Sequence, residues 1–228
     1  MRITVIGATG ATGRKVVERA LELGHEVVAI ARRPERINPA ERLNTRQADV
    51  LDATSIWKAI TDTEVVISCI GPTKSSPAGT FMAKSIPNAI AANFSPGTVM
   101  SEGTQNIVEA CERNGVQRLV MQSGIGLSDG RELTIGNRCL LGINRHILSK
   151  AIKDKGIAEH TVQHSNLNWI IVRPTGMTDT DATLSYIAAP GARISMTRTL
   201  SFADCADCLV RAATSEPDWD RTIVNVGR

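Results

Sequence analysis

The chain of 228 residues is long enough for one domain, or for one domain with a modest substrate-binding extension. Its hydrophobic content of 42% is ample for a core, and 26 basic and 23 acidic residues give a formal net charge of +3. No basic run indicates a nucleic-acid partner, no apolar stretch could span a membrane, and the N-terminus lacks a signal-peptide layout. We therefore expect a cytoplasmic protein, a monomer or small homo-oligomer, that binds neither nucleic acid nor membrane.

The N-terminal segment predicts a dinucleotide site. Ile3, Val5 and Ile6 form an apolar run that leads directly into the segment 7–13, Gly-Ala-Thr-Gly-Ala-Thr-Gly, and a helical pattern follows. In a strand, glycine turn and helix, the glycines let backbone N–H groups approach a pyrophosphate, and the helix N-terminus adds positive potential. The alternative is an ordinary turn between strand and helix that merely needs glycine.

Apolar segments alternate with helical segments along the rest of the chain. We predict further strands over 27–31, 46–50, 65–70, 118–122, 169–172 and 222–226. We predict helices over 54–60, 101–114 and 145–164, and one that begins near Ser201, where Asp204 completes a capping pattern. This alternation predicts an α/β fold: a single Rossmann-like domain over 1–228, with a doubly wound parallel sheet and helices on both faces. Ligands of such sheets bind at the carboxyl ends of the strands.

Two long stretches, 72–98 and 124–144, lack clear periodicity. Loops of this length are usually lids or binding loops, although a plain surface insertion is an alternative. We expect these two stretches, together with 174–200, to form a substrate cleft.

Three arginines follow the second predicted strand. Arg32, Arg33 and Arg36 stand where an NAD-binding protein usually has an acidic residue for the ribose hydroxyl. Because a guanidinium fork matches phosphate oxygens, the sequence favours NADP(H) over NAD. A solvated basic turn would explain the charge but not the missing acid.

Two other strand ends carry polar side chains. Asp49 follows the third predicted strand, where its carboxylate could accept from the adenine amine, or could serve only to form a turn. Ser123 ends the fifth predicted strand, which faces the nicotinamide in doubly wound dehydrogenases. Its hydroxyl could bind a substrate carbonyl or the carboxamide, or simply end the strand.

The usual proton donor of short-chain dehydrogenases is missing. That donor is a Tyr four residues before a Lys on the helix after the fifth strand. Lys155 lies on this helix, but Ala151 holds the Tyr position and the only tyrosine is Tyr186. The helix histidines, His146, His160 and His164, are more readily explained as structural or exposed. Cys205 and Cys208 form a C-x-x-C that we interpret as small helix residues, so no metal site is expected.

A family resemblance covers nearly the whole chain. Its motifs are the segment 7–13, Arg32, Asp49-Val50, Ile70-Gly71, the segment 98–108, Ser123 and Val172-Arg173-Pro174. Together they resemble the atypical short-chain dehydrogenases of the NmrA-like group, and within it the biliverdin reductase B, or NADPH flavin reductase, type. The start of the segment 98–108, Thr-Val-Met-Ser-Glu-Gly, is the more specific part, since the glycine motif belongs to the whole superfamily.

The resemblance implies an NADPH-dependent reductase of flavins or tetrapyrrole-like substrates, and it assigns positions. It places the pyrophosphate at Gly7, Thr9, Gly10 and Thr12, the 2′-phosphate at Arg32 and Arg36, adenine at Asp49 and Val50, and the nicotinamide at Ile70, Gly71, Met100 and Met121. We add the neighbouring Ala11, Gly13, Arg33, Pro174 and Thr175 to the predicted cofactor site. Ser123 matches the family's active-site serine, and we take Ser123 and Lys155 as the catalytic residues.

The sequence departs from the family on the substrate side. Family histidines near the nicotinamide are Lys155 and Thr175 here, the family's Arg after the Gly71 position is Thr73, and the stretch 72–98 is longer. Our leading hypothesis is an NADPH-dependent oxidoreductase that passes hydride to a flavin, quinone or tetrapyrrole-like acceptor. The alternatives are a non-catalytic NADP-binding redox sensor and a ketone or enone reductase. The latter needs a proton source that the sequence does not identify.

Overall fold

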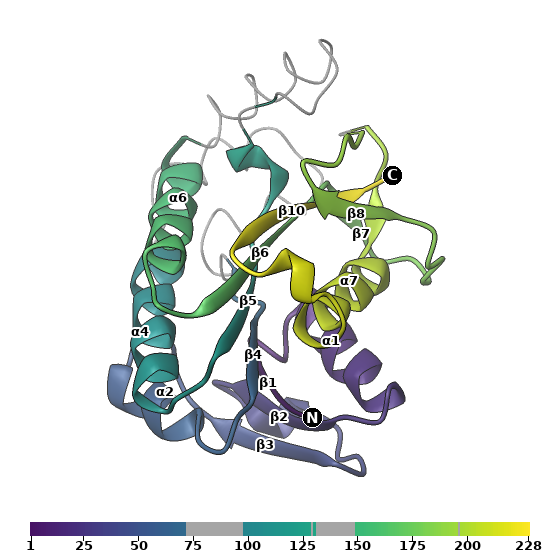
Figure 1. Cartoon of the computed structure of the whole chain (residues 1–228). Coiled ribbons are helices and arrows are strands. Elements are labelled where there is room, and N and C mark those ends of the chain that lie inside the picture. Colours follow the sequence, from purple (N-terminus) through teal and green to yellow (C-terminus); the bar gives the residue numbers. More distant parts are fainter. Residues whose placement is uncertain (72–97, 129, 131–148, 196) are drawn as a thin grey trace.

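A twisted, mostly parallel sheet lies between two layers of helices (Figure 1). The computed structural model describes residues 1–71, 98–128, 130, 149–195 and 197–228. Within them the sheet has eight strands in the order β3-β2-β1-β4-β5-β6-β10-β8. They are β1 (Arg2–Ile6), β2 (Glu26–Ala31), β3 (Leu43–Gln47), β4 (Val65–Ser68), β5 (Arg118–Gln122), β6 (Asn168–Pro174), β8 (Ile187–Pro190) and β10 (Thr222–Gly227). Only β8 is antiparallel to its neighbour, and a small second sheet pairs β7 (Met177–Thr178) with β9 (Leu200–Ser201).

Helices cover both faces of the sheet, as predicted. Figure 1 shows α1 and α7 on one face and α2, α4 and α6 on the other. Their bounds are α1 (Ala11–Glu22), α2 (Ala53–Ala59), α4 (Val99–Arg113), α6 (Ser149–Gln163) and α7 (Phe202–Thr214). Short 3-10 turns are η1 (Pro34–Arg36), η3 (Ile125–Leu127) and η4 (Pro217–Trp219). The predicted α/β, Rossmann-like doubly wound architecture is therefore confirmed.

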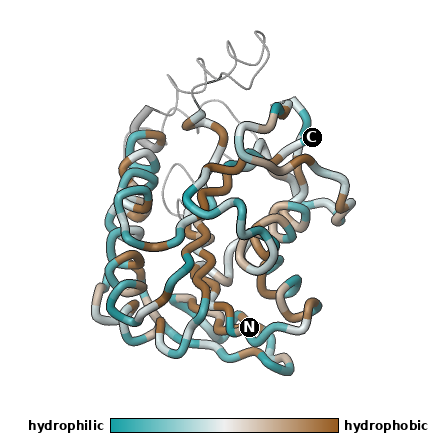
Figure 2. Tube along the Cα trace, viewed as in Figure 1, coloured by the Kyte–Doolittle hydropathy of each residue, from teal (hydrophilic) through white to brown (hydrophobic). Residues whose placement is uncertain are grey.

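The core of the described residues consists mainly of two large apolar clusters separated by the sheet. Ile3 and Val5 of β1 belong to the cluster under α1 and α7, whereas Ile6 belongs to the cluster under α2, α4 and α6. This division follows from the alternation of side chains along a strand, and burial on both faces makes the central strands continuously apolar. Figure 2 shows them as hydrophobic segments in the middle of the molecule.

The edges of the sheet differ from the sequence prediction. The third strand, expected over 46–50, lies over Leu43–Gln47. It pairs only with β2, and its Asn44 and Thr45 are exposed, so its sequence is too polar for an apolar pattern to locate it. The strands β7, β8 and β9 were not predicted, because each is short and none follows a helical segment.

The C-terminal helix begins at the predicted cap, but its acidic residue has another partner. The Ser201 hydroxyl accepts from the backbone N–H of Asp204 at 2.8 Å. The buried Asp204 carboxylate accepts from the N–H groups of Thr183 and Leu184, at 2.9 and 2.8 Å, and from Arg228. These hydrogen bonds lower the pKa of Asp204, although its burial acts in the opposite direction. The predicted capping residue thus attaches the 183–184 segment and the last residue to α7.

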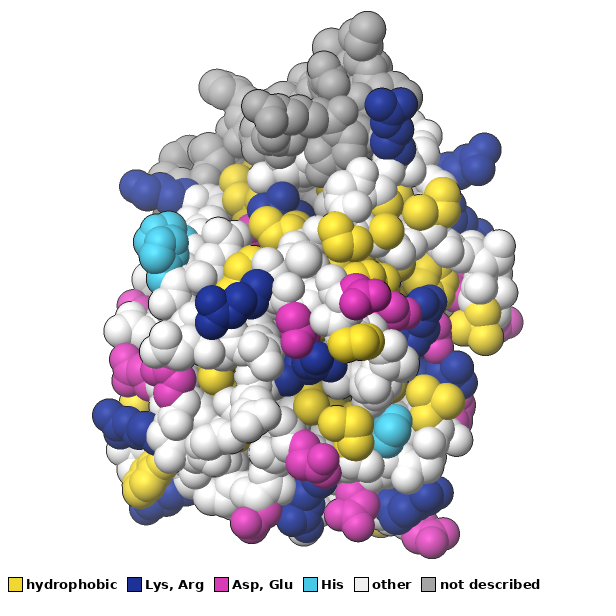
Figure 3. Space-filling model, viewed as in Figure 1, with side chains coloured by type: hydrophobic (Ala, Val, Ile, Leu, Met, Phe, Trp, Pro, Cys, Tyr) yellow, Lys and Arg dark blue, Asp and Glu magenta, His cyan; other side chains and the backbone are white. Residues whose placement is uncertain are grey.

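Charge is spread over the surface, as the composition indicates. Figure 3 shows basic and acidic side chains interspersed on the visible face. Among the described residues, no helix has the length and apolarity needed to cross a lipid bilayer.

Candidate active site

The glycine turn lies at the carboxyl end of β1, and its positions 7 and 13 have no room for a side chain. Gly7 has a φ of +81°, and a Cβ there would lie 2.8 Å from the Cys69 carbonyl oxygen. A Cβ on Gly13 would lie 2.2 Å from the Gly7 carbonyl oxygen. The start of α1 can therefore approach the strand end closely, which is what a bound pyrophosphate requires.

The N-terminus of α1 has the properties of an anion site. Gly10 is the N-cap residue and provides no side-chain cap, and the first turn contains no acidic residue. The first-turn N–H groups, including those of Ala11, Thr12 and Gly13, have no acceptor within the helix. Phosphate oxygens would supply acceptors, and the helix dipole favours their charge. Thr9 and Thr12 lie in the same turn.

The predicted 2′-phosphate arginines lie next to the glycine turn, at the end of the neighbouring strand β2. Arg32 and Arg33 are exposed directly after β2, and Arg36 is exposed in η1. The Gln47 amide donates to the Arg32 carbonyl oxygen at 3.3 Å and so holds this turn against β3. Within the described part of the chain, none of the three guanidinium groups forms an ion pair, so all three remain available to an anion.

The expected adenine position is shaped by α4 as well as by the 49–50 loop. The Asp49 carboxylate accepts from the N–H of Leu51 at 3.1 Å, so it does form a turn, the alternative reading of this residue. Asn106 donates to the Val50 carbonyl oxygen at 2.8 Å, and a Cβ on Gly103 would lie 2.9 Å from a Val50 methyl. The motif 98–108 contains Gly103 and Asn106, but the sequence assigned neither of them a role. A glycine inside a helix, which costs helix stability, was the signal of this close contact.

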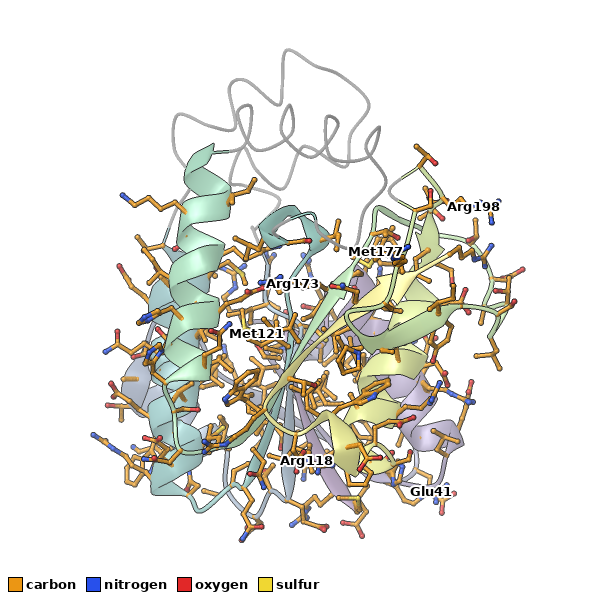
Figure 4. The ribbon with its side chains drawn as sticks, turned by 45° about the horizontal axis from the view of Figure 1, so that its top comes forward. Glu41, Arg118, Met121, Arg173, Met177 and Arg198 are labelled. Atoms are coloured by element: carbon orange, nitrogen blue, oxygen red, sulfur yellow. The ribbon has the colours of Figure 1, made fainter. Side chains whose placement is uncertain are left out.

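The residues expected on the nicotinamide side surround the ends of β4 and β5. Ile70 and Gly71 follow β4 and are partly buried. Met100 and Met121 are 3% and 1% exposed and belong to the cluster under α2, α4 and α6. Figure 4 labels Met121 among the side chains that pack beside the sheet. The two methionines thus belong to the buried core next to the ends of β4 and β5.

Ser123 and Lys155 meet at the end of β5. Ser123 is 5% exposed, and its hydroxyl has no hydrogen-bond partner among the described residues. The Lys155 ammonium donates to the Ser123 carbonyl oxygen at 3.4 Å, and a Cβ on Gly124 would lie 3.3 Å from Nζ. Burial lowers the pKa of Lys155, although the carboxylates of Glu159 and Asp154 oppose this shift. The structure therefore brings the two predicted catalytic residues together.

Two acidic residues of α6, both missed from the sequence, hold this helix in place. Asp154 accepts from the N–H groups of Met100 and Ser101 at 3.2 and 3.1 Å, and so caps α4 from a neighbouring helix. Glu159 accepts from Arg173 of β6 in a two-point ion pair with distances of 3.0 and 2.5 Å. Figure 4 shows Arg173 near the upper end of the sheet. Lys155 is thus positioned by anchors on both sides of it in the sequence.

The end of β6 and the segment after Ser123 add polar and apolar groups to the site. Pro174 ends β6, and the buried Thr175 donates its hydroxyl to the Arg198 carbonyl oxygen at 3.4 Å. Ile125, which follows Ser123 and Gly124, packs with Ile194 in a small apolar cluster. The strand end after Ser123 is therefore bordered by an apolar surface.

The only tyrosine is a structural residue on the other face of the sheet. Tyr186 donates to Asp207 of α7 at 2.5 Å, and Arg19 of α1 binds the other oxygen of this carboxylate at 2.8 Å. Burial raises the pKa of Tyr186. Lys155 lies on α6, which covers the opposite face. The single tyrosine of the sequence therefore lies away from Lys155.

Cys205 and Cys208 are free and buried in α7, as expected for small helix residues. Among the described residues, no cluster of His, Cys, Asp or Glu could hold a metal ion. Thr73, His146, the stretch 72–97 and most of 124–144 lie outside the described residues.

The predicted residues follow the carboxyl ends of the neighbouring parallel strands β3, β2, β1, β4, β5 and β6, so they lie along one side of the sheet. The tight glycine turn, the uncapped helix and the unpartnered Ser123 hydroxyl fit a dinucleotide. Fold and site together define a dinucleotide-binding protein with a Rossmann-like fold.

The chain belongs to the family described as NAD(P)H-binding, whose model matches residues 7–216. It is similar to an uncharacterized chloroplastic protein of Arabidopsis thaliana, at 28% identity over 194 residues that make up 83% of this chain and 64% of that protein. The chain thus spans less than two thirds of the length of the first curated relatives it matches.

Two solved structures share the fold over the whole chain. One is a short-chain dehydrogenase/reductase from Veillonella parvula in complex with NADP, with a TM-score of 0.75, 21% identity and coverage of 100% of this chain and 94% of that one. The other is ChuY, an anaerobilin reductase from Escherichia coli O157:H7, with a TM-score of 0.74, 19% identity and coverage of 100% and 97%. Both comparisons agree with the fold of this chain, and the family model identifies it as a member of the NAD(P)H-binding family.

Proposed function

We propose that this protein is an NADPH-dependent reductase that transfers hydride to a flat, conjugated small molecule such as a flavin, a quinone or a tetrapyrrole-like compound. The observation that carries the proposal is the pairing of Ser123 and Lys155 on the same sheet edge as the glycine turn. When bound there, NADPH supplies the hydride. The chain itself binds, orients and shields the reactants.

Each part of the edge has a role in this proposal. The turn at Gly7 and the N-terminus of α1 bind the pyrophosphate, and Arg32 and Arg36 bind the 2′-phosphate. The Ser123 hydroxyl orients the acceptor or the carboxamide, and Lys155 contacts the ribose or stabilises charge near it. The apolar pair Ile125 and Ile194 suits a flat acceptor and keeps water away from it.

The experiment is NADPH oxidation by the purified chain, followed at the NADPH absorbance with FMN, a quinone and biliverdin as separate acceptors. We expect turnover with at least one of them, and slower turnover with NADH than with NADPH. An unchanged absorbance with every acceptor would refute a reductase. Equal affinity for NADP⁺ and NADPH without turnover would instead indicate the redox sensor.

The arginines test the cofactor preference separately. Arg32→Ala should lower the affinity for NADPH by roughly tenfold or more, because a charge-assisted hydrogen bond to phosphate is worth about 1.5–3 kcal/mol. The affinity for NADH, which lacks the 2′-phosphate, should change little. Isothermal titration with both cofactors measures this, and Arg113→Ala, at the distant end of α4, is the matched control. Equal losses for NADPH and NADH would contradict the assignment.

A further inference from the structure

The Lys155 ammonium is a partly buried cation without an ion-pair partner in the described part of the chain. Its only acceptor there is the neutral carbonyl oxygen of Ser123, at 3.4 Å. The unpartnered Ser123 hydroxyl belongs to the same residue. The Lys155 ammonium and the residue that carries the unpartnered hydroxyl thus share one strand end, two residues before Ile125 of the small apolar cluster.

The charged groups around Lys155 are engaged elsewhere. On α6, Asp154 is bound to the N–H groups of Met100 and Ser101, and Glu159 is bound to Arg173 of β6. At the end of β5, the groups found next to its ammonium are uncharged: the Ser123 carbonyl oxygen, and Gly124, where a Cβ would lie 3.3 Å from Nζ. Both carboxylates are thus held by other donors. Burial lowers the pKa of Lys155, although the negative charges of Glu159 and Asp154 favour its protonated form.

We propose that Lys155 is the proton donor of the reaction, and that the acceptor is therefore a conjugated carbonyl compound whose oxygen lies between the Lys155 Nζ and the Ser123 hydroxyl. This inference rests on the proposed function and narrows it. A flavin takes hydride at a ring nitrogen and needs no strong enzyme acid. A conjugated carbonyl develops negative charge on oxygen, where a positioned acid lowers the barrier.

The step balances as follows. The acceptor gains a hydride from the reduced cofactor at a carbon conjugated to its carbonyl, and the carbonyl π electrons move to oxygen. An N–H bond of Lys155 breaks, and its proton forms an O–H bond with that oxygen. Lys155 becomes a neutral amine and regains a proton from water. In total, acceptor, NADPH and one proton give the reduced acceptor and NADP⁺.

Lys155→Arg tests the inference with FMN and menadione, a quinone, as acceptors. A guanidinium keeps the charge but does not release a proton. We expect kcat with menadione to fall by about 10²–10⁴-fold, the usual contribution of a positioned acid. The loss with FMN should be at least about tenfold smaller, and the KM for NADPH should change little. Lys153→Ala, an exposed neighbour on α6, is the matched control.

The pH profile separates acid catalysis from mere binding of the ribose. In the wild type, kcat with menadione should fall as the pH rises through the pKa of Lys155, and this fall should vanish in Lys155→Arg. A ribose-binding lysine would instead raise the KM for NADPH and leave the shape of the profile unchanged. Gly124→Ala gives a second variant that keeps Lys155, because its methyl group would press against Nζ; it should reduce kcat with menadione in the same direction.

A readout independent of turnover completes the test. Lysine labelled with ¹³C at Cε is titrated by NMR in the cofactor-free protein, and the Lys155 signal is the one that Lys155→Arg removes. Its pKa should lie below the ordinary value of about 10.4 and match the kinetic profile. An ordinary pKa, or equal losses with both acceptors, would overturn the inference while NADPH oxidation still supported the reductase. Failure of the wild type to oxidise NADPH at all would instead remove the proposed function.

Discussion

Gly13→Ala should nearly abolish binding of the dinucleotide. The new methyl group would lie 2.2 Å from the Gly7 carbonyl oxygen and 2.8 Å from its carbonyl carbon, both of which are backbone atoms. No side chain can rotate away, so α1 must move from β1. A displacement of about 1 Å can cost roughly 10²-fold in a positioned site, and we expect at least that loss of NADPH affinity. The crowding itself should cost about 1–3 kcal/mol of stability.

Isothermal titration with NADPH and thermal unfolding measure the two effects. Gly156→Ala is the matched control, since its nearest atom, a Leu127 methyl, would be in ordinary contact at 3.6 Å. Alanine inside α6 should stabilise the chain by about 0.5–1 kcal/mol. Gly13→Ala protein that is folded and binds NADPH with wild-type affinity would show that the turn does not hold the cofactor.

The sequence predicts the nucleotide half of the molecule well because its signals are local. The close contact between Gly13 and the Gly7 carbonyl oxygen lies within seven residues of chain, whereas the contact of Gly7 itself is with Cys69 of the neighbouring strand end. The central strands are buried on both faces, which makes them continuously apolar and easy to locate. Ser123 and Lys155 could be chosen because one ends a strand and the other lies on the next predicted helix.

The missed residues act through partners that are distant in the sequence. Asp154 binds N–H groups more than fifty residues earlier, and Glu159 binds Arg173 on the next strand. In the sequence, neither Asp154 nor Glu159 can be told apart from the acidic residues that lie on the exposed surface of a helix. The predicted position of the edge strand β3 was wrong for a related reason. A strand with one neighbour buries few of its side chains, so its position depends on the register with β2 rather than on its own residues.

The ion pair between Glu159 and Arg173 should be the most sensitive charged contact of the fold. The two side chains are 5% and 12% exposed, and both nitrogen–oxygen contacts are within hydrogen-bond distance. Glu159→Ala leaves the Arg173 guanidinium buried without its anion. We expect a loss of about 3–5 kcal/mol in the free energy of unfolding, measured by urea denaturation.

The control for this prediction is an ion pair on the surface. Arg211 and Glu216 also pair, but their side chains are 44% and 24% exposed, so Glu216→Ala should cost no more than about 1 kcal/mol. A loss that small for Glu159→Ala would contradict the assigned importance of the buried pair.

The double variant Glu159→Leu with Arg173→Met separates stability from function. It removes both charges together, so stability should return close to the wild-type value, as replacement of buried ion pairs by apolar residues often allows. Catalysis should not return if the pair also positions Lys155, which lies one helical turn before Glu159. We expect kcat to stay below the wild type, and the pKa of Lys155 to fall further because a nearby carboxylate is lost. Restoration of both stability and kcat would show that the pair only holds α6 against the sheet.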